Sequence, residues 1–302
     1  RDGMHVLVAG GNGFIGSHLV PELLADDHEV TVLARNPDTD AVPDGVEAVS
    51  GDITAYDSIE SAVAGHDAVV NLVALSPLFK PKGGDEMHDE VHRHGTENLV
   101  RAAEAGGVDR FLQLSALGAD PDGATAYIRA KGQAEEHVTD SALDWTIIRP
   151  SVVFGEGGEF VSFTKKLKGM FAPGVPVYPL PGGGTTRFQP IHVNDLVEML
   201  AETLTDDAHV RETYELGGPE NLTLREITNM VYDAEGKSIT IVSVPMALAG
   251  VGLSVGGKIP GFPMGADQYR SLQFDNTTAD NDIDAFGVEP GSLTTLGSYL
   301  AG

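Results

Sequence analysis

The sequence predicts an α/β protein built on a doubly wound parallel sheet, with a smaller C-terminal lobe. Three observations support this fold class. Apolar runs alternate with segments of helical spacing through the first half of the chain, a glycine-rich turn follows the first run directly, and the alternation weakens after Pro150. Buried parallel strands read as continuous apolar runs, and right-handed crossovers place helices on both faces of such a sheet.

Each β-strand of this sheet is expected at an apolar run. The runs are Val6–Ala9, Glu29–Leu33, Val46–Val49, Ala68–Val73, Arg110–Leu114 and Trp145–Ile148. The clearest helix is expected over Thr96–Ala105, because Gly106 and Gly107 follow it and glycine is favoured just after a helix C-terminus. Strands and helices therefore alternate as a parallel sheet requires.

The first expected strand runs directly into a glycine turn and a helix start. The glycines satisfy two overlapping spacings, Gly11-x-Gly13-x-x-Gly16 and Gly10-x-x-Gly13-x-x-Gly16. Without side chains at these positions, backbone amides and the helix N-terminus can approach a pyrophosphate. The turn therefore predicts a dinucleotide site.

The second half of the chain is expected to interleave two domains. We assign residues 1–154 and 186–218 to a dinucleotide-binding domain, and residues 155–185 and 219–302 to a smaller substrate-binding lobe over the carboxyl ends of the strands. The apolar stretch Val244–Val255 is too short to span a bilayer. We expect it to pack in the core of the lobe rather than to act as an anchor.

Composition excludes several functions. The chain of 302 residues has no Cys, which rules out disulfides, cysteine-ligated metals and thiol catalysis. Its 45 acidic and 19 basic residues give a net charge of −26, which argues against nucleic acid or an anionic membrane surface as the main partner. With no membrane span and no signal peptide, we expect a cytoplasmic protein with at most peripheral membrane contact. The acidity fits either a highly soluble mesophilic protein or a halophilic, haloarchaeal protein. In the second case a high salt concentration would screen the repulsion between the negative charges.

A candidate catalytic group lies at Tyr127 and Lys131, which share one face if their segment is helical. A nearby cation lowers the pKa of a phenol, so Tyr127 could serve as a general acid or base. Ser115, at the end of an expected strand, could polarise a substrate carbonyl. Together the three side chains fit redox chemistry between a carbonyl and an alcohol, whereas the alternative is a surface Tyr–Lys pair and a turn serine.

Arg35 follows the second expected strand, where a site that prefers NAD generally presents a carboxylate to the ribose. A guanidinium there suits a 2′-phosphate, so NADP(H) is favoured over NAD(H); the alternative is a surface Arg. His88 and His92 have the helical spacing of metal ligands but lie among acidic residues. We expect a solvated acidic face there and predict no metal site.

Several segments of the sequence resemble the short-chain dehydrogenase/reductases of the extended or atypical kind. This resemblance implies a Rossmann fold and an epimerase/dehydratase-like character. Tyr127, Lys131 and Ser115 match that family's motif. The branch it resembles contains the NADPH-binding accessory subunit of respiratory complex I. The matching segments are Val-Ala-Gly-Gly-Asn-Gly-Phe-Ile-Gly at 8–16, Ser-Ala-Leu-Gly-Ala-Asp at 115–120, Ile-Arg-Pro-Ser-Val-Val-Phe-Gly at 148–155, Gln-Pro-Ile-His-Val-Asn-Asp at 189–195 and Tyr-Glu-Leu-Gly-Gly-Pro-Glu at 214–220.

The resemblance implies a set of cofactor-binding residues. Asp52 and Ile53 would contact the adenine, Pro150–Val153 would flank the nicotinamide, and Lys131 would also bind the nicotinamide ribose. The full set is Gly10, Asn12, Gly13, Phe14, Ile15, Gly16, Arg35, Asp52, Ile53, Ala74, Lys131, Pro150, Ser151 and Val153. One departure concerns the central helix, where His92 replaces the Asn that relatives often carry before Gly-Thr.

Three functions remain open from the sequence. The leading hypothesis is an NADP(H)-dependent oxidoreductase that uses Tyr127 as general acid/base, Ser115 to orient the oxygen and Lys131 to tune Tyr127. The second is a non-catalytic NADP(H)-binding subunit, structural or assembly-related, of a quinone-linked respiratory complex. The third is a sugar-nucleotide epimerase or dehydratase. The apolar 244–264 segment leaves room for a hydrophobic substrate such as a quinone, a lipid or an isoprenoid.

Overall fold

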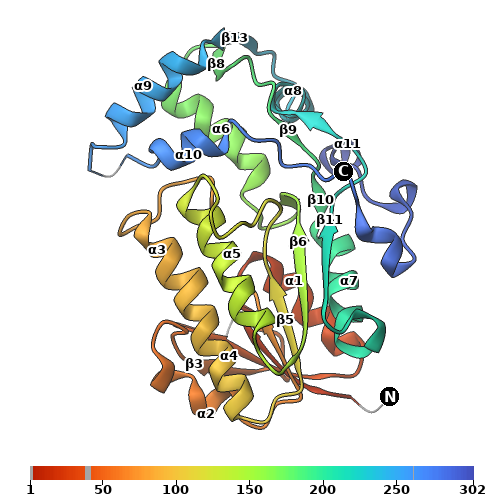
Figure 1. Ribbon diagram of the computed structural model, residues 1–302. Coiled ribbons are helices and arrows are strands. Elements are labelled where there is room, and N and C mark those ends of the chain that lie inside the picture. The colour runs from red at the N-terminus through yellow and green to blue at the C-terminus, as the bar shows by residue number, and fades with distance from the viewer. Residues whose placement is uncertain (1–2, 38–41, 261) are drawn as a thin grey trace. The chain divides into compact units, whose positions relative to one another are not determined.

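A computed structural model describes residues 3–37, 42–260 and 262–302 as two compact units (Figure 1). The first unit comprises Arg1–Leu75, Asp85–Pro150 and Val193–Glu215, and the second comprises Ser76–Gly84, Ser151–His192 and Leu216–Gly302. These boundaries differ from those expected at 154, 186 and 218. The segment Ser76–Gly84, which we had assigned to the dinucleotide-binding domain, belongs to the second unit.

The first unit is built on a seven-stranded sheet. Its spatial order is β11 (Glu212–Leu216), β6 (Asp144–Pro150), β5 (Arg110–Leu114), β4 (Ala68–Asn71), β1 (His5–Ala9), β2 (Glu29–Ala34) and β3 (Glu47–Ser50). Strands β1 to β6 pair in parallel with their neighbours. Each overlaps one predicted apolar run. The predicted doubly wound parallel sheet is therefore confirmed, and its order reverses between β1 and β4, where such sheets bind ligands.

Helices flank this sheet. They are α1 (Phe14–Ala25), α2 (Glu60–Val63), α3 (Glu86–His88), α4 (Gly95–Ala105), α5 (Ala126–Thr139) and α7 (Val193–Thr205), with 3-10 turns at Tyr56–Ser58 and Asp207–His209. The predicted helix Thr96–Ala105 matches α4 to within one residue. A π-helical segment, Asp89–His94, joins α3 to α4 without a break. Helix α1 packs beside α7, and α4 packs beside α5.

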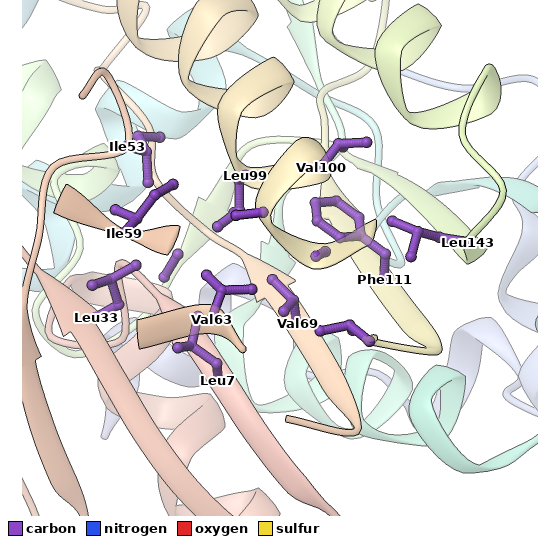
Figure 2. Close-up of a cluster of buried hydrophobic side chains, with 14 of the residues drawn as sticks. Leu7, Leu33, Ile53, Ile59, Val63, Val69, Leu99, Val100, Phe111 and Leu143 are labelled. Carbon is purple, nitrogen blue, oxygen red and sulfur yellow. The ribbon is translucent and has the colours of Figure 1, made fainter. Parts of the chain in front are cut away.

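The core of the first unit lies where α4 covers the central strands (Figure 2). Leu7 and Val69 project from β1 and β4 toward Leu99 of α4, and Phe111 of β5 extends the same cluster. All four side chains are almost completely buried. The apolar runs fold as strands because alternate residues can then bury on both covered faces of the sheet.

A buried polar triangle lies beside this apolar core. The amide of Asn71, at the end of β4, donates to Thr96 of α4 (3.2 Å) and to Gln113 of β5 (2.9 Å). The amide of Gln113 also donates to the Thr96 hydroxyl, at 3.3 Å. Each group is buried and hydrogen-bonded, which limits the free-energy penalty of burying it. The triangle links β4, β5 and α4 at the carboxyl side of the sheet.

The second unit contains three two-stranded sheets. Strand β7 (Val153–Phe154) pairs with β10 (Ile191–His192) in parallel, β8 (Val177–Pro181) with β13 (Thr240–Val244) in parallel, and β9 (Arg187–Phe188) with β12 (Leu222–Thr223) antiparallel. The helices are α6 (Phe160–Phe171), α8 (Leu224–Ala234), α9 (Met246–Gly256), α10 (Ala266–Ser271) and α11 (Leu296–Ala301), with 3-10 turns at Asp282–Phe286 and Pro290–Ser292. Phe163, Tyr178 and Leu180 anchor its core.

Helix α9 corrects one prediction. We expected Val244–Val255 to pack as core, yet within α9 only Gly250 and Leu253 are buried. Leu248, Val251 and Val255 are 65%, 64% and 62% exposed. Among the residues described, we find no helix with both the length and the apolar character that a membrane crossing demands.

Candidate functional site: the glycine turn and the Tyr127 cluster

The glycine turn after β1 has the geometry that a bound dinucleotide requires. Gly10 adopts φ +79°, a conformation that favours glycine, and its carbonyl accepts a 3.0 Å hydrogen bond from the Gly13 amide. A Cβ on Gly16 would lie 2.5 Å from the backbone of Gly11, so only glycine allows α1 to start this close to the turn. The glycines thus hold the helix N-terminus against the end of β1.

The N-terminus of α1 is free to meet an anion. Gly13 is the N-cap residue and has no side chain to cap the first amides, and the first turn holds no acidic residue. The leading N–H groups of a helix lack intrahelical partners and carry partial positive charge. Asn12 is exposed, and Phe14 and Ile15 are partly exposed at the helix start. The residues present therefore fit a dinucleotide pyrophosphate.

Arg35 directly follows β2 and has an exposed side chain. Its backbone carbonyl accepts a 2.9 Å hydrogen bond from the Ser50 hydroxyl at the end of β3, so the chain is tied down where the guanidinium projects. Residues 38–41, which come shortly after it, lie outside the described residues. The cation thus stands at the carboxyl end of the strand next to the glycine turn.

The predicted adenine pair is held by its own local contacts. The Asp52 carboxylate accepts hydrogen bonds from the amide and the hydroxyl of Thr54, at 2.9 and 2.8 Å. The side chain of Ile53 is buried in the core, and its carbonyl accepts from Asn98 at 2.8 Å. Ala74 is exposed, on the loop after β4.

The predicted nicotinamide-flanking residues fall on both units. Pro150 ends β6 in the first unit, whereas Ser151 and Val153 lie in the second. The Ser151 hydroxyl donates to the Gln189 carbonyl, and Val153 is part of β7. Their contribution to a cofactor site stays a prediction.

Tyr127 and Lys131 lie on one face of α5, as their spacing predicts. The helix starts at this point because the Thr125 side chain accepts a hydrogen bond from the Ile128 amide. The Lys131 ammonium lies 5.8 Å from the centroid of the Tyr127 ring and donates to the Leu114 carbonyl at 3.2 Å. The pair therefore stands beside the carboxyl end of β5.

The electrostatics of this pair differ from the expectation. Burial lowers the pKa of the Lys131 ammonium from 10.5 to about 8, and the attraction of Glu135 only partly opposes this. Burial also raises the pKa of Tyr127, where we expected Lys131 to lower it. Lys131 is still largely protonated at neutral pH, but in the protein alone the phenol stays firmly neutral.

Two histidines surround Tyr127, and they correct the expectation of a solvated acidic face. His88 and His92 are 1% and 2% exposed and stack on each other with centroids 5.6 Å apart. Each ring also meets the Tyr127 ring edge-on at 5.4 Å. They point inward because the helix that carries them packs against α5 through its π-helical segment.

His92 is held as a neutral hydrogen-bond acceptor. Its Nε2 accepts from the Leu75 amide at 3.2 Å, so Nδ1 carries the ring proton. Burial holds the pKa of His92 well below 6.5, and the charges of Lys131 and His88 lower it further. The residue that replaces the family's Asn thus binds backbone next to Tyr127 instead of lying in solvent.

Ser115 belongs to a buried ionic network that sequence reasoning missed. Its hydroxyl donates to Glu135 Oε2 at 3.0 Å, and Glu135 accepts two further bonds from Arg149 Nε at 2.9 and 3.2 Å. Burial raises the pKa of Glu135, while Arg149 and Ser115 oppose that shift. Helical spacing could have revealed Glu135, because it lies four residues after Lys131 and eight after Tyr127.

Comparison with known proteins supports the dinucleotide site. The family model described as NAD(P)H-binding matches residues 10–170. The mitochondrial NADH dehydrogenase (ubiquinone) 1 alpha subcomplex subunit 9 of Arabidopsis thaliana is 29% identical over 300 residues, covering 93% of this chain and 72% of that protein. The NAD(P)H azoreductase of Xenophilus azovorans is 25% identical, covering 82% of each chain.

A solved structure gives the same fold. The dTDP-glucose 4,6-dehydratase DesIV from Streptomyces venezuelae, with NAD and TYD bound, is 25% identical and superposes with a TM-score of 0.66 over 80% of this chain and 84% of that one. The fold, the glycine turn and the sequence matches agree. The chain belongs to the NAD(P)H-binding family, as a short-chain dehydrogenase/reductase of the epimerase/dehydratase-like kind.

Proposed function

We propose that this protein is an NADP(H)-dependent oxidoreductase that interconverts a carbonyl and an alcohol. The observation that carries the proposal is the Tyr127–Lys131 pair. The ammonium and the phenol share one face of α5, and Lys131 is fixed by the Leu114 carbonyl at the carboxyl end of the sheet. A titratable phenol beside a cation suits proton transfer to a substrate oxygen.

Bound at the glycine turn, the nicotinamide dinucleotide would donate or accept the hydride. In the reductive direction, Tyr127 gives its proton to the carbonyl oxygen as the carbon receives the hydride, so one C–H and one O–H bond form. Lys131 stabilises the phenolate left behind, because the positive charge favours the ionised phenol. The site must then reprotonate Tyr127 from solvent before the next turnover.

Ser115 fits its predicted role only after a change of partner. Its hydroxyl hydrogen points to the Glu135 carboxylate, so it must rotate away from that acceptor to donate to a substrate oxygen. Arg149 still binds Glu135 in that case, so the carboxylate does not lose all its hydrogen bonds. We therefore assign Ser115 to positioning and Tyr127 to proton transfer.

The preference for NADP(H) is part of the same proposal and rests on Arg35. We would titrate the full chain calorimetrically with NADPH, NADP⁺, NADH and NAD⁺, for the wild type and for Arg35→Ala. The proposal expects tight NADPH binding that Arg35→Ala weakens at least about tenfold, with little effect on NADH. Equal losses for both cofactors would refute the role of Arg35 in phosphate recognition, and no binding of any dinucleotide would refute the function.

Turnover is tested separately with Tyr127→Phe. A carbonyl substrate panel would be screened for NADPH oxidation, including quinones, lipid ketones and isoprenoid aldehydes, because the sequence leaves room for a hydrophobic substrate. We expect Tyr127→Phe to retain NADPH affinity and to lose activity by at least about a hundredfold. A variant as active as the wild type would exclude Tyr127 as the acid/base.

A second candidate function is a non-catalytic NADP(H)-binding subunit of a respiratory complex. Two observations favour it: Ser115 is hydrogen-bonded to Glu135, and burial raises the pKa of Tyr127. The named relative in Arabidopsis thaliana is a subunit of NADH dehydrogenase. This function predicts that NADPH raises the melting temperature of wild type and Tyr127→Phe equally, without turnover of any substrate. A cytoplasmic location, at most peripheral to the membrane, is part of both proposals.

A further inference from the structure

Acidic residues are absent from three segments of the second unit. Residues 76–84, 160–192 and 236–266 contain no Asp or Glu, although the chain has 45 acidic residues in all. The same segments carry a concentration of basic residues. These are Lys80, Lys82, Lys165, Lys166, Lys168, Arg187, Lys237 and Lys258, and they include every lysine of the chain except Lys131. A protein of net charge −26 therefore has one markedly cationic region.

Exposed apolar side chains gather in the same segments. Of the large hydrophobic residues that the structure describes as exposed, all but Phe274 lie within them. They are Phe171, Val175, Val177, Val242, Leu248, Val251, Val255 and Ile259. Monomeric soluble proteins rarely leave such a group of apolar side chains in contact with water without a function.

Helix α9 is apolar on two opposite faces. Gly250 and Leu253 face the core of the second unit, where Leu253 joins the buried cluster. Leu248, Val251 and Val255 follow at intervals of three and four residues, so they form one stripe on the opposite face. A helix that is apolar all round is normally covered on every side. The outward stripe of α9 therefore calls for a covering partner.

The three acid-free segments form one continuous part of the second unit. The Lys80 amide donates to the Pro263 carbonyl at 2.7 Å, and the Lys80 ammonium donates to the Gly257 carbonyl just after α9. The Phe79 ring packs edge-on against Phe163 of α6. Strand β8 pairs with β13, which leads into α9 (Figure 1). The cationic and the apolar residues thus belong to segments that pack directly against one another.

We propose that this region, the outward face of α9 together with its flanking lysines, docks onto a bilayer of anionic lipids. Leu248, Val251 and Val255 would enter the boundary between headgroups and acyl chains, while Lys82 and Lys258 would contact the headgroup phosphates. The eleven residues of α9 are too few to span a bilayer, so the helix lies along the surface. Lysine suits this position because its apolar stem can lie beside lipid while its ammonium reaches the phosphate.

Charge complementarity favours lipid over a second copy of the chain. Lys165 and Lys237 already pair with Glu235, which directly precedes the third segment. A two-fold interface would place the remaining cations of each copy against themselves, because the three segments contain no carboxylate of their own. An anionic membrane instead attracts each lysine near its surface. The docking does not depend on the cofactor, because the glycine turn lies in the other unit.

The test is cosedimentation of the full chain with vesicles of phosphatidylcholine alone and of phosphatidylcholine and phosphatidylglycerol in equal parts. It is run over a salt series in which circular dichroism shows the protein folded. We expect binding on the order of tenfold tighter to the anionic vesicles, with the difference shrinking as salt screens the lysines. Wild type that stays in the supernatant with anionic vesicles overturns the proposal.

Two variants and their matched controls assign the contact. Leu248→Gln/Val251→Gln/Val255→Gln keeps good helix formers and should weaken binding to both vesicle types at least about tenfold, whereas Phe274→Gln should not. Lys82→Glu/Lys258→Glu should remove the preference for anionic vesicles, whereas Arg225→Glu, an exposed cation outside the three segments, should keep it.

Other outcomes give clear answers. Binding by the triple variant equal to wild type would exclude α9. A wild type that dimerises in sedimentation velocity without binding vesicles, combined with a monomeric triple variant, would assign the surface to a second copy instead. Arg35→Ala should bind vesicles as wild type does, so failure of the proposed cofactor function and failure of lipid docking are distinguishable.

Discussion

Replacing Lys131 by Met is expected to stabilise the protein at neutral pH. Burial lowers the pKa of this ammonium from 10.5 to about 8, so the folded state holds the charge less readily than the unfolded chain. The difference, 10.5 − 8, corresponds to about 3.4 kcal/mol at about 1.36 kcal/mol per pKa unit. Loss of the hydrogen bond to the Leu114 carbonyl offsets about 1 kcal/mol. Lys131→Met should therefore unfold with about 2 kcal/mol more free energy.

The gain should depend on pH with a defined sign. Between pH 8 and 10.5 the unfolded chain holds a proton that the folded protein has lost, so the stability of the wild type rises with pH across this window. The advantage of Lys131→Met is thus complete below about pH 8 and should disappear near about pH 10.5. Urea unfolding at these two pH values, followed by the fluorescence of the single Trp145 on β6, measures it.

A matched control is the exposed Lys82→Met, which should leave the unfolding midpoint unchanged. A Lys131→Met variant that is no more stable than wild type at neutral pH, or a gain of equal size at both pH values, would contradict a destabilising buried ammonium at this position. The expected result would show that the chain keeps Lys131 at the expense of stability, as catalytic groups often are kept.

Three further perturbations follow from the structure. Gly16→Ala should lower the free energy of unfolding by about 1–3 kcal/mol and weaken NADPH binding, because its Cβ meets the Gly11 backbone. The control Gly169→Ala on α6 meets nothing within 4 Å and should be as stable as wild type or more stable by up to about 1 kcal/mol, because Ala is the better helix former; urea melts and calorimetry measure both variants. Glu135→Gln should destabilise the protein by about 2–3 kcal/mol, because it breaks the buried ion pair with Arg149. The control Glu215→Gln removes a more exposed partner of Arg149 and should cost less than about 1 kcal/mol. Equal losses of stability in the two variants would contradict a special role of the buried Ser115–Glu135–Arg149 network. Lowering salt from about 1 M to about 0.1 M should lower the melting temperature by exposing the repulsion of a net charge of −26, and an unchanged melting temperature would count against a halophilic protein.

Apart from the edge strand β3, which is only partly buried, the parallel strands of the sheet are covered on both faces, and this made the sheet predictable from the sequence. Such burial leaves continuous apolar runs, and the runs from Val6–Ala9 to Trp145–Ile148 each overlap a strand of the structure. The glycine turn could also be predicted from the sequence, because the spacing of its glycines reflects places where two backbone segments lie too close together for a side chain. These signals are local in the chain.

Only part of the cluster around Tyr127 could be predicted from the sequence. The pairing with Lys131 follows from helical spacing, but the neighbours of Tyr127 come from another helix. His88 and His92 lie among acidic residues in the sequence, and a π-helical segment turns them inward, which periodicity of 3.6 residues cannot anticipate. The Ser115 hydroxyl donates to Glu135 because α5 places that carboxylate beside the end of β5. Contacts between elements, rather than within them, decide these features.

The second unit was the least predictable part. Its strands are two to five residues long, so they leave little periodic signal, and α9 carried no polar face from which its orientation could be read. The segment 76–84 joined this unit through contacts with residues almost two hundred positions away, such as that between Lys80 and Pro263. Sequence alone had assigned it to its neighbours in the chain.

The polar triangle of Asn71, Thr96 and Gln113 has a consequence for how the sheet assembles. A slip of β5 by one residue along β4 would turn the Gln113 side chain to the opposite face and remove its bonds to both partners. An apolar core alone would tolerate such a slip, since the neighbouring residues of β5 are also hydrophobic. The two amides and the hydroxyl thus make the native register of β4 and β5 more stable than a register shifted by one residue.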